Sequence, residues 1–219
     1  MLTITETLFE SNESSNSGSA IENDGTLQLE RSLLVGNQNG SQGTGGVLFN
    51  AGTATIVNTT FSTNRGTAID TWGSHTTTLR ASTLYGNQSY GFQAGYGILS
   101  SSGTTNMHNT IVAANTSNCQ IYSQAMLASQ GFNISSDNTC DLFATGDRRN
   151  LDPMLDPLAN NGGATRTHMP RAGSPAIDEG QCHSSVTVDQ RGMPRPAGDT
   201  CDIGAVEVSY AVWLSVGRR

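Results

Sequence analysis

The chain contains no lysine, so all eleven of its basic residues are arginine. Eighteen acidic residues outnumber them and give a formal net charge of -7 at pH 7. A protein that binds nucleic acid by neutralising phosphates needs a basic excess, so the charge excludes nucleic acid as a partner. The missing lysine also removes a common base of polysaccharide lyases. Arg65 and Arg80 are the only basic residues of the central repeats described below. A polysaccharide lyase that uses an arginine base is therefore also disfavoured.

Long apolar runs and helix-forming stretches are missing as well. No segment reaches the roughly 18 consecutive apolar residues of a transmembrane helix. Long stretches of Ala, Leu, Glu and Lys, which helical bundles and coiled coils require, do not occur either. The first residues, Met1–Glu6, have neither the basic nor the apolar region of a signal peptide, so we expect the export signal to be absent from this sequence.

Small polar residues dominate instead. Gly, Ser, Thr and Asn number 25, 24, 26 and 18, which is 93 of the 219 residues. Many of them belong to one phrase that occurs five times, beginning at Leu2, Leu27, Ala54, Thr77 and Thr105. Successive copies start 25, 27, 23 and 28 residues apart, which is the spacing of a repeat protein.

Each copy of the phrase carries the same four columns of residue types. An apolar residue is followed by a hydroxyl, a second apolar residue and a final asparagine. The columns are Ile4, Leu29, Ile56, Leu79 and Met107; Thr7, Ser32, Thr59, Ser82 and Thr110; Phe9, Leu34, Phe61, Leu84 and Val112; and Asn12, Asn37, Asn64, Asn87 and Asn115. A Gly-rich turn and a short apolar run follow, so every repeat supplies three short strands.

One such repeat cannot bury its apolar side alone, but stacked repeats can, with like residues forming ladders. Stacked backbones lie about 4.8 Å apart, so hydroxyl and amide side chains can hydrogen-bond to their own copies above and below. We therefore predict an all-β fold for residues 1–150, a right-handed parallel β-helix of about five to six rungs. A β-sandwich with coincidental turn spacing is the alternative, and five aligned copies argue against it.

The repeat decays after Cys119, and residues 151–219 are richer in Pro, Asp and Arg. We predict that they form an irregular C-terminal cap that lies across the sheets and covers the open end of the solenoid, where strand edges are unpaired.

The four cysteines fall into neighbouring pairs 21 and 19 residues apart, without a zinc-type spacing. We predict the disulfides Cys119–Cys140 and Cys182–Cys201, formed in an oxidising compartment. Four reduced thiols that pack as small apolar residues are the alternative.

The tail contains a set of short motifs. They are Leu151-Asp-Pro, Leu158-Ala-Asn-Asn-Gly-Gly-Ala-Thr165 with His168, Ser174-Pro-Ala-Ile-Asp178, Asp189-Gln-Arg-Gly192 with Arg195-Pro196, and Cys201-Asp-Ile-Gly-Ala-Val-Glu207. Together with the repeats, over roughly residues 1–207, they resemble the choice-of-anchor Q family. That resemblance implies a bacterial secreted β-helix protein displayed at the cell surface, and it implies no reaction. Because a signal and a long apolar anchor are missing at the two ends, we expect a fragment or a truncated reading frame.

Two carboxylates are the candidate catalytic residues of a carbohydrate-active hydrolase. With Ile21, Phe49, Ile69 and Ile98 facing inward, strand alternation places Glu22, Asn50, Asp70 and Leu99 outside or at a turn. Glu22 and Asp70 would then be two rungs, about 9.6 Å, apart, near the upper end of the separation in inverting glycosidases. The candidate substrate-binding residues are Asn50, Trp72, His75, Tyr85, Tyr90 and Tyr96, with Phe92 in a neighbouring loop. Solvated turn carboxylates and aromatics that fill loop cores are the alternative.

Four tail residues carry side chains that ligate metals: His168, Asp178, His183 and Asp189. They define a hypothetical hydrolytic centre for calcium or another divalent cation, although their spacing matches no metal motif. Structural pairing of Asp178 or Asp189 with Arg191 or Arg195 is the alternative, because the arginine fork suits carboxylates.

Three functions are therefore open. The first is a secreted or cell-surface, adhesin-like module, monomeric and without a required cofactor, that contacts an extracellular glycan or another cell-surface polymer. The second is a hydrolase of extracellular polysaccharide that uses Glu22 and Asp70. The third is a hydrolase with the tail-based metal centre. We favour the first, because no group of residues in the sequence makes a distinctive catalytic pattern.

Overall fold

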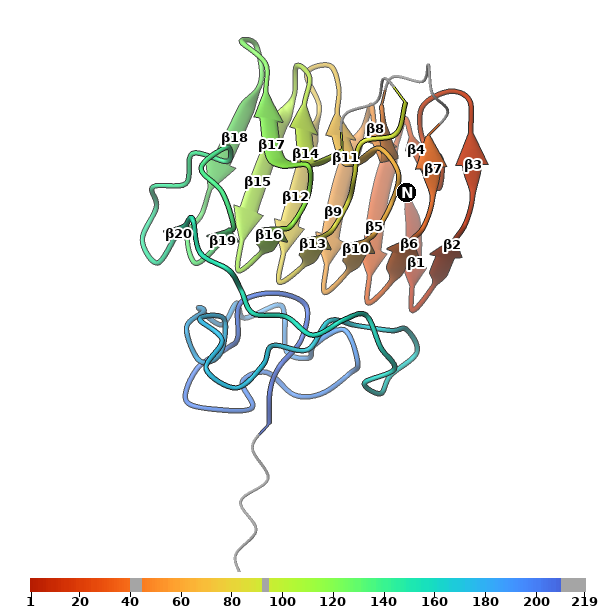
Figure 1. The fold of residues 1–219 in the computed structure, drawn as a ribbon. Helices are drawn as coiled ribbons and strands as arrows, with labels where there is room; N and C mark the ends of the chain where they lie inside the picture. Colours follow the sequence, from red (N-terminus) through yellow and green to blue (C-terminus); the bar gives the residue numbers. More distant parts are fainter. Residues whose placement is uncertain (40–44, 92–94, 210–219) are drawn as a thin grey trace, which may run out of the picture.

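The computed structural model describes residues 1–39, 45–91 and 95–209 of the chain. These residues form strands, turns and loops, and they contain no helix. The chain winds through three parallel sheets in about five turns, which makes a parallel β-solenoid and confirms the predicted fold class (Figure 1). Within the described ranges, no helix is long and apolar enough to cross a membrane.

The three sheets are labelled A, B and C in the order in which each turn visits them. Sheet A contains β1 (Leu2–Thr5), β5 (Thr26–Glu30), β9 (Thr53–Val57), β12 (Thr76–Arg80), β15 (Thr104–His108) and β18 (Met126–Ser129). Sheet B contains β2 (Leu8–Glu10), β6 (Leu33–Val35), β10 (Thr60–Ser62), β13 (Thr83–Tyr85), β16 (Ile111–Ala113), β19 (Ile134–Ser135) and β20 (Arg148–Arg149). Sheet C contains β4 (Ile21–Asn23), β8 (Gly46–Asn50), β11 (Thr67–Thr71), β14 (Tyr96–Ser100) and β17 (Ser117–Ile121). A short pair, β3 (Glu13–Ser14) and β7 (Gln38–Asn39), stands between sheets B and C.

The two apolar columns of the repeat form ladders in the interior. In sheet A, Leu29 pairs with Ile4 on one side and Ile56 on the other, and both Leu29 and Ile56 are fully buried. In sheet B, Phe61 pairs with the equivalent residues of the turns before and after it. Burying a side chain of this size contributes about 1.5–3 kcal/mol, so a few apolar residues per turn hold the solenoid together.

The hydroxyl column stabilises the turn between sheets A and B. The residue before each hydroxyl has a positive φ, for example 48° at Asn58. The Thr59 hydroxyl donates to the carbonyl of Val57 and accepts the backbone N–H of Ser32 from the previous rung. The prediction that these hydroxyls bond to their own copies was therefore wrong in detail. Each one bonds to backbone groups, because the left-handed turn leaves an N–H that needs an acceptor.

The asparagine column makes a side-chain ladder, as predicted. The Asn64 amide donates to Oδ1 of Asn87 at 2.7 Å, and Asn37 donates to Oδ1 of Asn64 at 3.1 Å. Backbone N–H groups donate to the same oxygens, so each Oδ1 accepts two hydrogen bonds. These buried amides are therefore satisfied without water.

The second turn of sheet C differs by one residue from the prediction. Leu48, not Phe49, pairs with Ile21 and Ile69 and faces inward. Phe49 therefore lies outside, in the column of Glu22 and Asp70. The run Val47-Leu48-Phe49 is apolar throughout, so alternation alone could not fix its register.

The tail packs on the solenoid, as predicted, but it lies along the outer face of sheet B and not over the open end (Figure 1). Thr60 donates to Oε1 of Gln190 at 2.6 Å, and Gln190 donates in turn to the carbonyl of Ser32 at 3.1 Å. Apolar residues of the tail and of sheet B make a second core: Ile111, Ala113, Ile134, Leu155, Ala176 and Ile203. The middle strands of sheet B are thus buried on both faces, which explains why β6 and β16 are apolar throughout.

The tail holds its own shape with buried ion pairs. Asp189 accepts two hydrogen bonds from the Arg191 guanidinium, which confirms the structural Asp–Arg pairing. Arg195 pairs with Glu207, and both side chains are almost fully buried. Burial raises the pKa of the Glu207 carboxyl, while the Arg195 charge opposes that rise.

Both predicted disulfides are present, and the described residues contain no free cysteine. Cys182–Cys201 closes a loop within the tail. Cys119–Cys140 lies at the C-terminal end of the solenoid and joins β17 to the segment that follows β19. That segment also buries Leu142 against the interior, so it covers part of the end that we had assigned to the tail.

Candidate functional site

The candidate catalytic carboxylates share one outward column of sheet C, but only one of them is accessible. Glu22 and Asp70 both pair with Phe49, which stands between them. Glu22 is exposed, whereas Asp70 is only 2% exposed and accepts a hydrogen bond from the Ser101 hydroxyl at 2.8 Å. Burial raises the pKa of Asp70 to about 6. A carboxyl in this position cannot contact a polymeric substrate, so the geometry gives no support to a catalytic pair.

The candidate sugar-binding residues do not converge on one face. Asn50 points into the interior and donates to the Thr77 hydroxyl at 2.9 Å, which corrects its predicted outward placement. The other five lie at separate places: Trp72 and His75 at the turn from sheet C to sheet A, Tyr85 on sheet B, Tyr90 between sheets B and C, and Tyr96 at the start of β14. Trp72 is 52% exposed and its ring stands 6.4 Å from Phe49. Phe92 lies outside the described residues.

Each of the four tail residues predicted to bind metal interacts with a different partner within the protein. They are His168, Asp178, His183 and Asp189. His168 contacts Ser62, and Asp189 pairs with Arg191. Asp178 accepts the N–H of Thr200, and His183 contacts the Ser185 hydroxyl. Across residues 1–39, 45–91 and 95–209, no three His, Cys, Asp or Glu side chains are placed to hold a metal ion, which contradicts the predicted centre.

Sequence reasoning missed the contact between Ser62 and His168. The Nδ1 atom of His168 lies 2.8 Å from the Asp156 carbonyl, so it carries the proton, and the Ser62 hydroxyl donates to Nε2 at 2.9 Å. Burial lowers the pKa of His168, which agrees with a neutral ring. A serine activated by histidine is a nucleophile geometry. Ser62 is 0% exposed beneath the tail, however, so this pair serves to attach the tail to sheet B.

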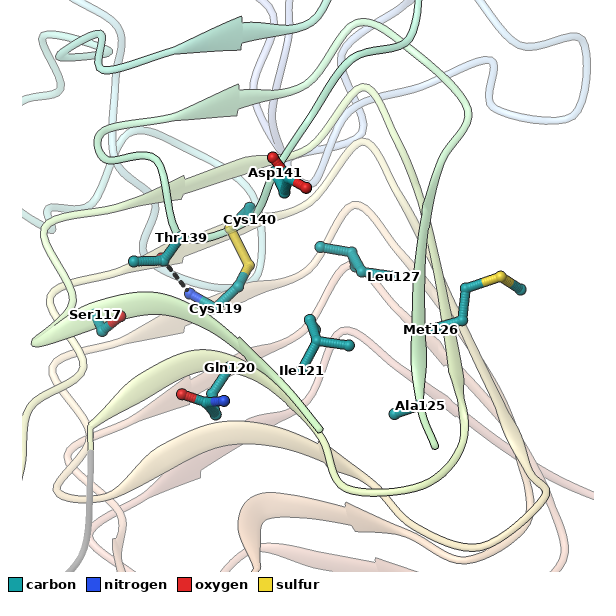
Figure 2. A pocket seen from close by; sticks show the side chains of 10 residues that line it. All are labelled: Ser117, Cys119, Gln120, Ile121, Ala125, Met126, Leu127, Thr139, Cys140 and Asp141. Carbon is teal, nitrogen blue, oxygen red and sulfur yellow. Dashed lines mark hydrogen bonds between the residues drawn. A yellow bond between two sulfur atoms is a disulfide. The ribbon is translucent and has the colours of Figure 1, made fainter. Parts of the chain in front are cut away.

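A basin of about 530 Å³ occupies the C-terminal end of the solenoid. It lies between the ends of β17 and β18 and the segment carrying Thr139, with Ile121, Leu127 and the Cys119–Cys140 disulfide around it (Figure 2). The Thr139 hydroxyl accepts the backbone N–H of Cys119 at 2.9 Å. No residue that lines the basin has a buried polar side-chain atom lacking a partner, so the walls offer no group that requires a ligand.

A smaller groove of about 380 Å³ runs between the outer face of sheet A and the tail segment 185–188. Strand alternation in β5, β9 and β12 points one side chain in two toward it. Its floor and rim are formed by Gln28, Glu30, Arg31, Thr55, Val57, Asn58 and Arg80. Its outer wall is attached by a hydrogen bond from the Asn58 amide to the carbonyl of Val188, at 2.7 Å.

Three residues that line the groove carry buried polar atoms without a hydrogen-bond partner in the protein. Oδ1 of Asn58 and the Nε atoms of Arg31 and Arg80 are buried and have no hydrogen-bond partner. Asn58 is only 4% exposed, so its oxygen cannot turn to bulk solvent. These atoms have almost no accessible surface, so the polar groups available to a ligand are other ones in the lining, such as those of Gln28, Glu30 and Thr55. The groove has a volume within the range of small-ligand sites, about 300–1,000 Å³.

Sequence analysis singled out none of these groove residues except Arg80. A signal was present in the polar residues that alternate with the apolar column of sheet A, such as Gln28 and Glu30. Such alternation predicts only a solvent-exposed face of the sheet. The groove forms because residues 185–188 pack beside that face.

Comparisons with known proteins add no relative: no family model, no curated protein and no solved structure matches the chain.

Proposed function

We propose that the protein is a secreted or cell-surface module that binds an extracellular glycan in the groove between sheet A and residues 185–188. The observation that carries the proposal is the groove itself, about 380 Å³ in volume and lined mainly by polar side chains from three neighbouring strands of sheet A. A sugar hydroxyl both donates and accepts hydrogen bonds, so it can pair with the amide, carboxylate and hydroxyl groups of Gln28, Glu30 and Thr55 that line the groove.

The remaining walls suit the same ligand. Gln28 and Glu30 present planar polar groups to the groove, held together by a hydrogen bond of 2.7 Å. Val57 and Val186 supply apolar surface, which a sugar ring can contact through its C–H groups. The groove is open, so it can accept one or two units within a longer chain.

Export and surface display complete the proposal. The two disulfides fit an oxidising compartment, and the resemblance of the tail motifs to choice-of-anchor Q proteins implies a cell-surface location. A solenoid offers a stable support for such a groove, because each rung is held by its neighbours on both sides.

An array of extracellular polysaccharides probed with the full-length protein tests the proposal. We expect saturable binding to at least one glycan, weakened about fivefold or more by Gln28→Ala, which removes a groove side chain. Gln124→Ala is the matched control, because Gln124 is exposed in the turn before β18, outside the groove. The proposal fails if the folded protein binds no glycan, or if the two variants weaken binding equally.

A further inference from the structure

Arg80 is a cation of the groove that no other group of the protein neutralises. Nine arginines lie within residues 1–39, 45–91 and 95–209. Six of them pair with a carboxylate, and two others, Arg65 and Arg149, lie over aromatic rings. Within those ranges, only the side chain of Arg80 makes no hydrogen bond, ion pair or ring contact. In a chain with eighteen acidic residues, a free guanidinium that lines a groove is available to a ligand.

The Arg80 guanidinium is enclosed at its inner end and accessible at its outer end. Its Nε atom is buried without a partner, whereas the two terminal nitrogen atoms, which are also unbonded, are not buried. A side chain whose stem is already packed loses little conformational freedom when its end group binds a ligand. An ion pair formed at such a partly buried position is also stronger than one formed in open water.

The neighbouring charges leave Arg80 uncompensated. Arg31 also lines the groove, but it pairs with Glu6 at 3.1 Å. Among the described residues of the lining, Glu30 is the one carboxylate. Glu30 stands two strands away from Arg80, with Val57 between them in the same row of sheet A, so about 9.6 Å separates their backbones. A ligand group bound to Arg80 therefore does not contact Glu30.

The charge of the groove is opposite to that of the whole chain. The described lining contains two arginines and one glutamate, which gives a formal charge of +1, whereas the chain carries -7. At physiological ionic strength, exposed charges more than about 8 Å apart are largely screened from each other. The local cation therefore determines which charge a bound ligand prefers at this position.

We propose that the glycan bound in this groove carries a carboxylate, as uronic acids do, and that the Arg80 guanidinium pairs with it. The inference rests on the proposed glycan function and names the class of sugar. Two coplanar carboxylate oxygens match the two parallel N–H bonds that a guanidinium offers. Val57 then lies against the C–H groups of the sugar, while Gln28 and Glu30 pair with hydroxyls farther along the glycan. A phosphate ester is disfavoured, because its second charge would find no second free cation.

Binding of the full-length protein to carboxylated glycans and to their carboxyl-reduced forms tests the proposal. The probes are hyaluronan, alginate and polygalacturonate. Each is compared with the same polymer after its carboxylates have been converted to –CH₂OH groups, a change that keeps the backbone and the other hydroxyls. We expect at least one native polymer to bind saturably, and to bind about tenfold or more weakly after reduction, because the charge-assisted hydrogen bonds to Arg80 are lost.

A pair of variants assigns the effect to one residue. Arg80→Gln should bind the native and the reduced polymer with affinities within about twofold of each other. Arg149→Gln is the matched control and should keep the full difference, because Arg149 is exposed and its guanidinium lies over the Phe143 ring. The comparison of native with reduced polymer uses the wild type, so it holds even if Arg80→Gln does not fold.

The outcomes separate this inference from the proposed function. Equal affinity for native and reduced polymers, or a preference for neutral or sulfated glycans, would overturn the carboxylate and leave glycan binding intact. A difference that persists in folded Arg80→Gln would overturn the role of Arg80. If no glycan binds, charged or neutral, the proposed function fails and this inference fails with it.

Discussion

Ser62 donates a hydrogen bond to His168 across 2.9 Å, although 106 residues separate them in the sequence. The contact joins the third turn of sheet B to the tail, and the Tyr85 ring lies 4.7 Å from the same imidazole. His168 must be neutral to accept this bond while it donates to Asp156. This hydrogen bond between the tail and sheet B therefore requires the His168 ring to be neutral, with no proton on Nε2.

Acid should weaken that attachment. The folded-state pKa of His168 lies below its ordinary value of about 6.5, so its contribution to stability is present above that pH and is lost as the pH falls through the folded pKa. We expect the free energy of unfolding to drop between pH 7.5 and 5 by more in the wild type than in His168→Gln. Urea denaturation at the two pH values measures the difference. An exposed histidine supplies the control, His75→Gln, and a reduced pH dependence in that variant would contradict the assignment.

The buried carboxyl of Asp70 should give the free energy of unfolding the opposite pH dependence. Its pKa rises from 3.8 to about 6 on folding, mainly through burial, so the folded state binds the proton more tightly. Stability contributed by this group is therefore lost as the pH rises from about 4 to about 6. Asp70→Asn mimics the protonated form and should be about 3 kcal/mol more stable than the wild type at pH 7.5, and similar to it at pH 4. Urea titrations at both pH values test this, with exposed Asp24→Asn as the control; equal stabilities at pH 7.5 would disprove it.

The asparagine ladder should be sensitive in its middle and tolerant at its end. Asn64 is buried and both accepts from Asn37 and donates to Asn87. Asn64→Ala leaves several buried groups unpaired and should cost about 3 kcal/mol or more. Asn12 is exposed and donates only toward Asn37, so Asn12→Ala should cost about 1 kcal/mol or less. Chemical denaturation compares the two variants, and similar losses would show that the ladder does not act as described.

The Cys119–Cys140 disulfide should stabilise the end of the solenoid. Replacing both cysteines by serine should lower the free energy of unfolding by about 3 kcal/mol, given a loop of 21 residues. Intact-mass measurement should first show two hydrogens fewer for each disulfide than in the reduced chain. Limited proteolysis of the Cys119→Ser/Cys140→Ser variant should then cut near Leu142, which loses its anchor to the interior. Unchanged stability and an unchanged cleavage pattern would speak against this role.

The solenoid could be predicted because its information is local and repeated. Leu29 and Asn64 each belong to a column with four further copies, so an error at one position is corrected by the others. Leu48 and Phe49 had no such support, since three apolar residues in a row fit either register. Their misplacement moved Asn50 from the interior to the surface and made it a false binding residue.

The groove could not be predicted, because it depends on where the tail packs. Val188 and Asn58 are 130 residues apart, and no periodicity connects them. The sequence did contain one indication of the docking face. All residues of β6, Leu33–Val35, are apolar, which is typical of a strand buried on both sides. Such a run shows that something covers sheet B, but not which segment does so.

The most direct test of glycan binding in the groove is the affinity of two tryptophan variants for whichever glycan the array identifies. Thr55 points into the groove from β9, so Thr55→Trp should fill it and weaken binding at least tenfold. Asn106 lies in the same outward column of sheet A, two strands away and outside the groove lining, so Asn106→Trp should bind like the wild type. Equal affinity in the two variants, with both folded, would contradict the account.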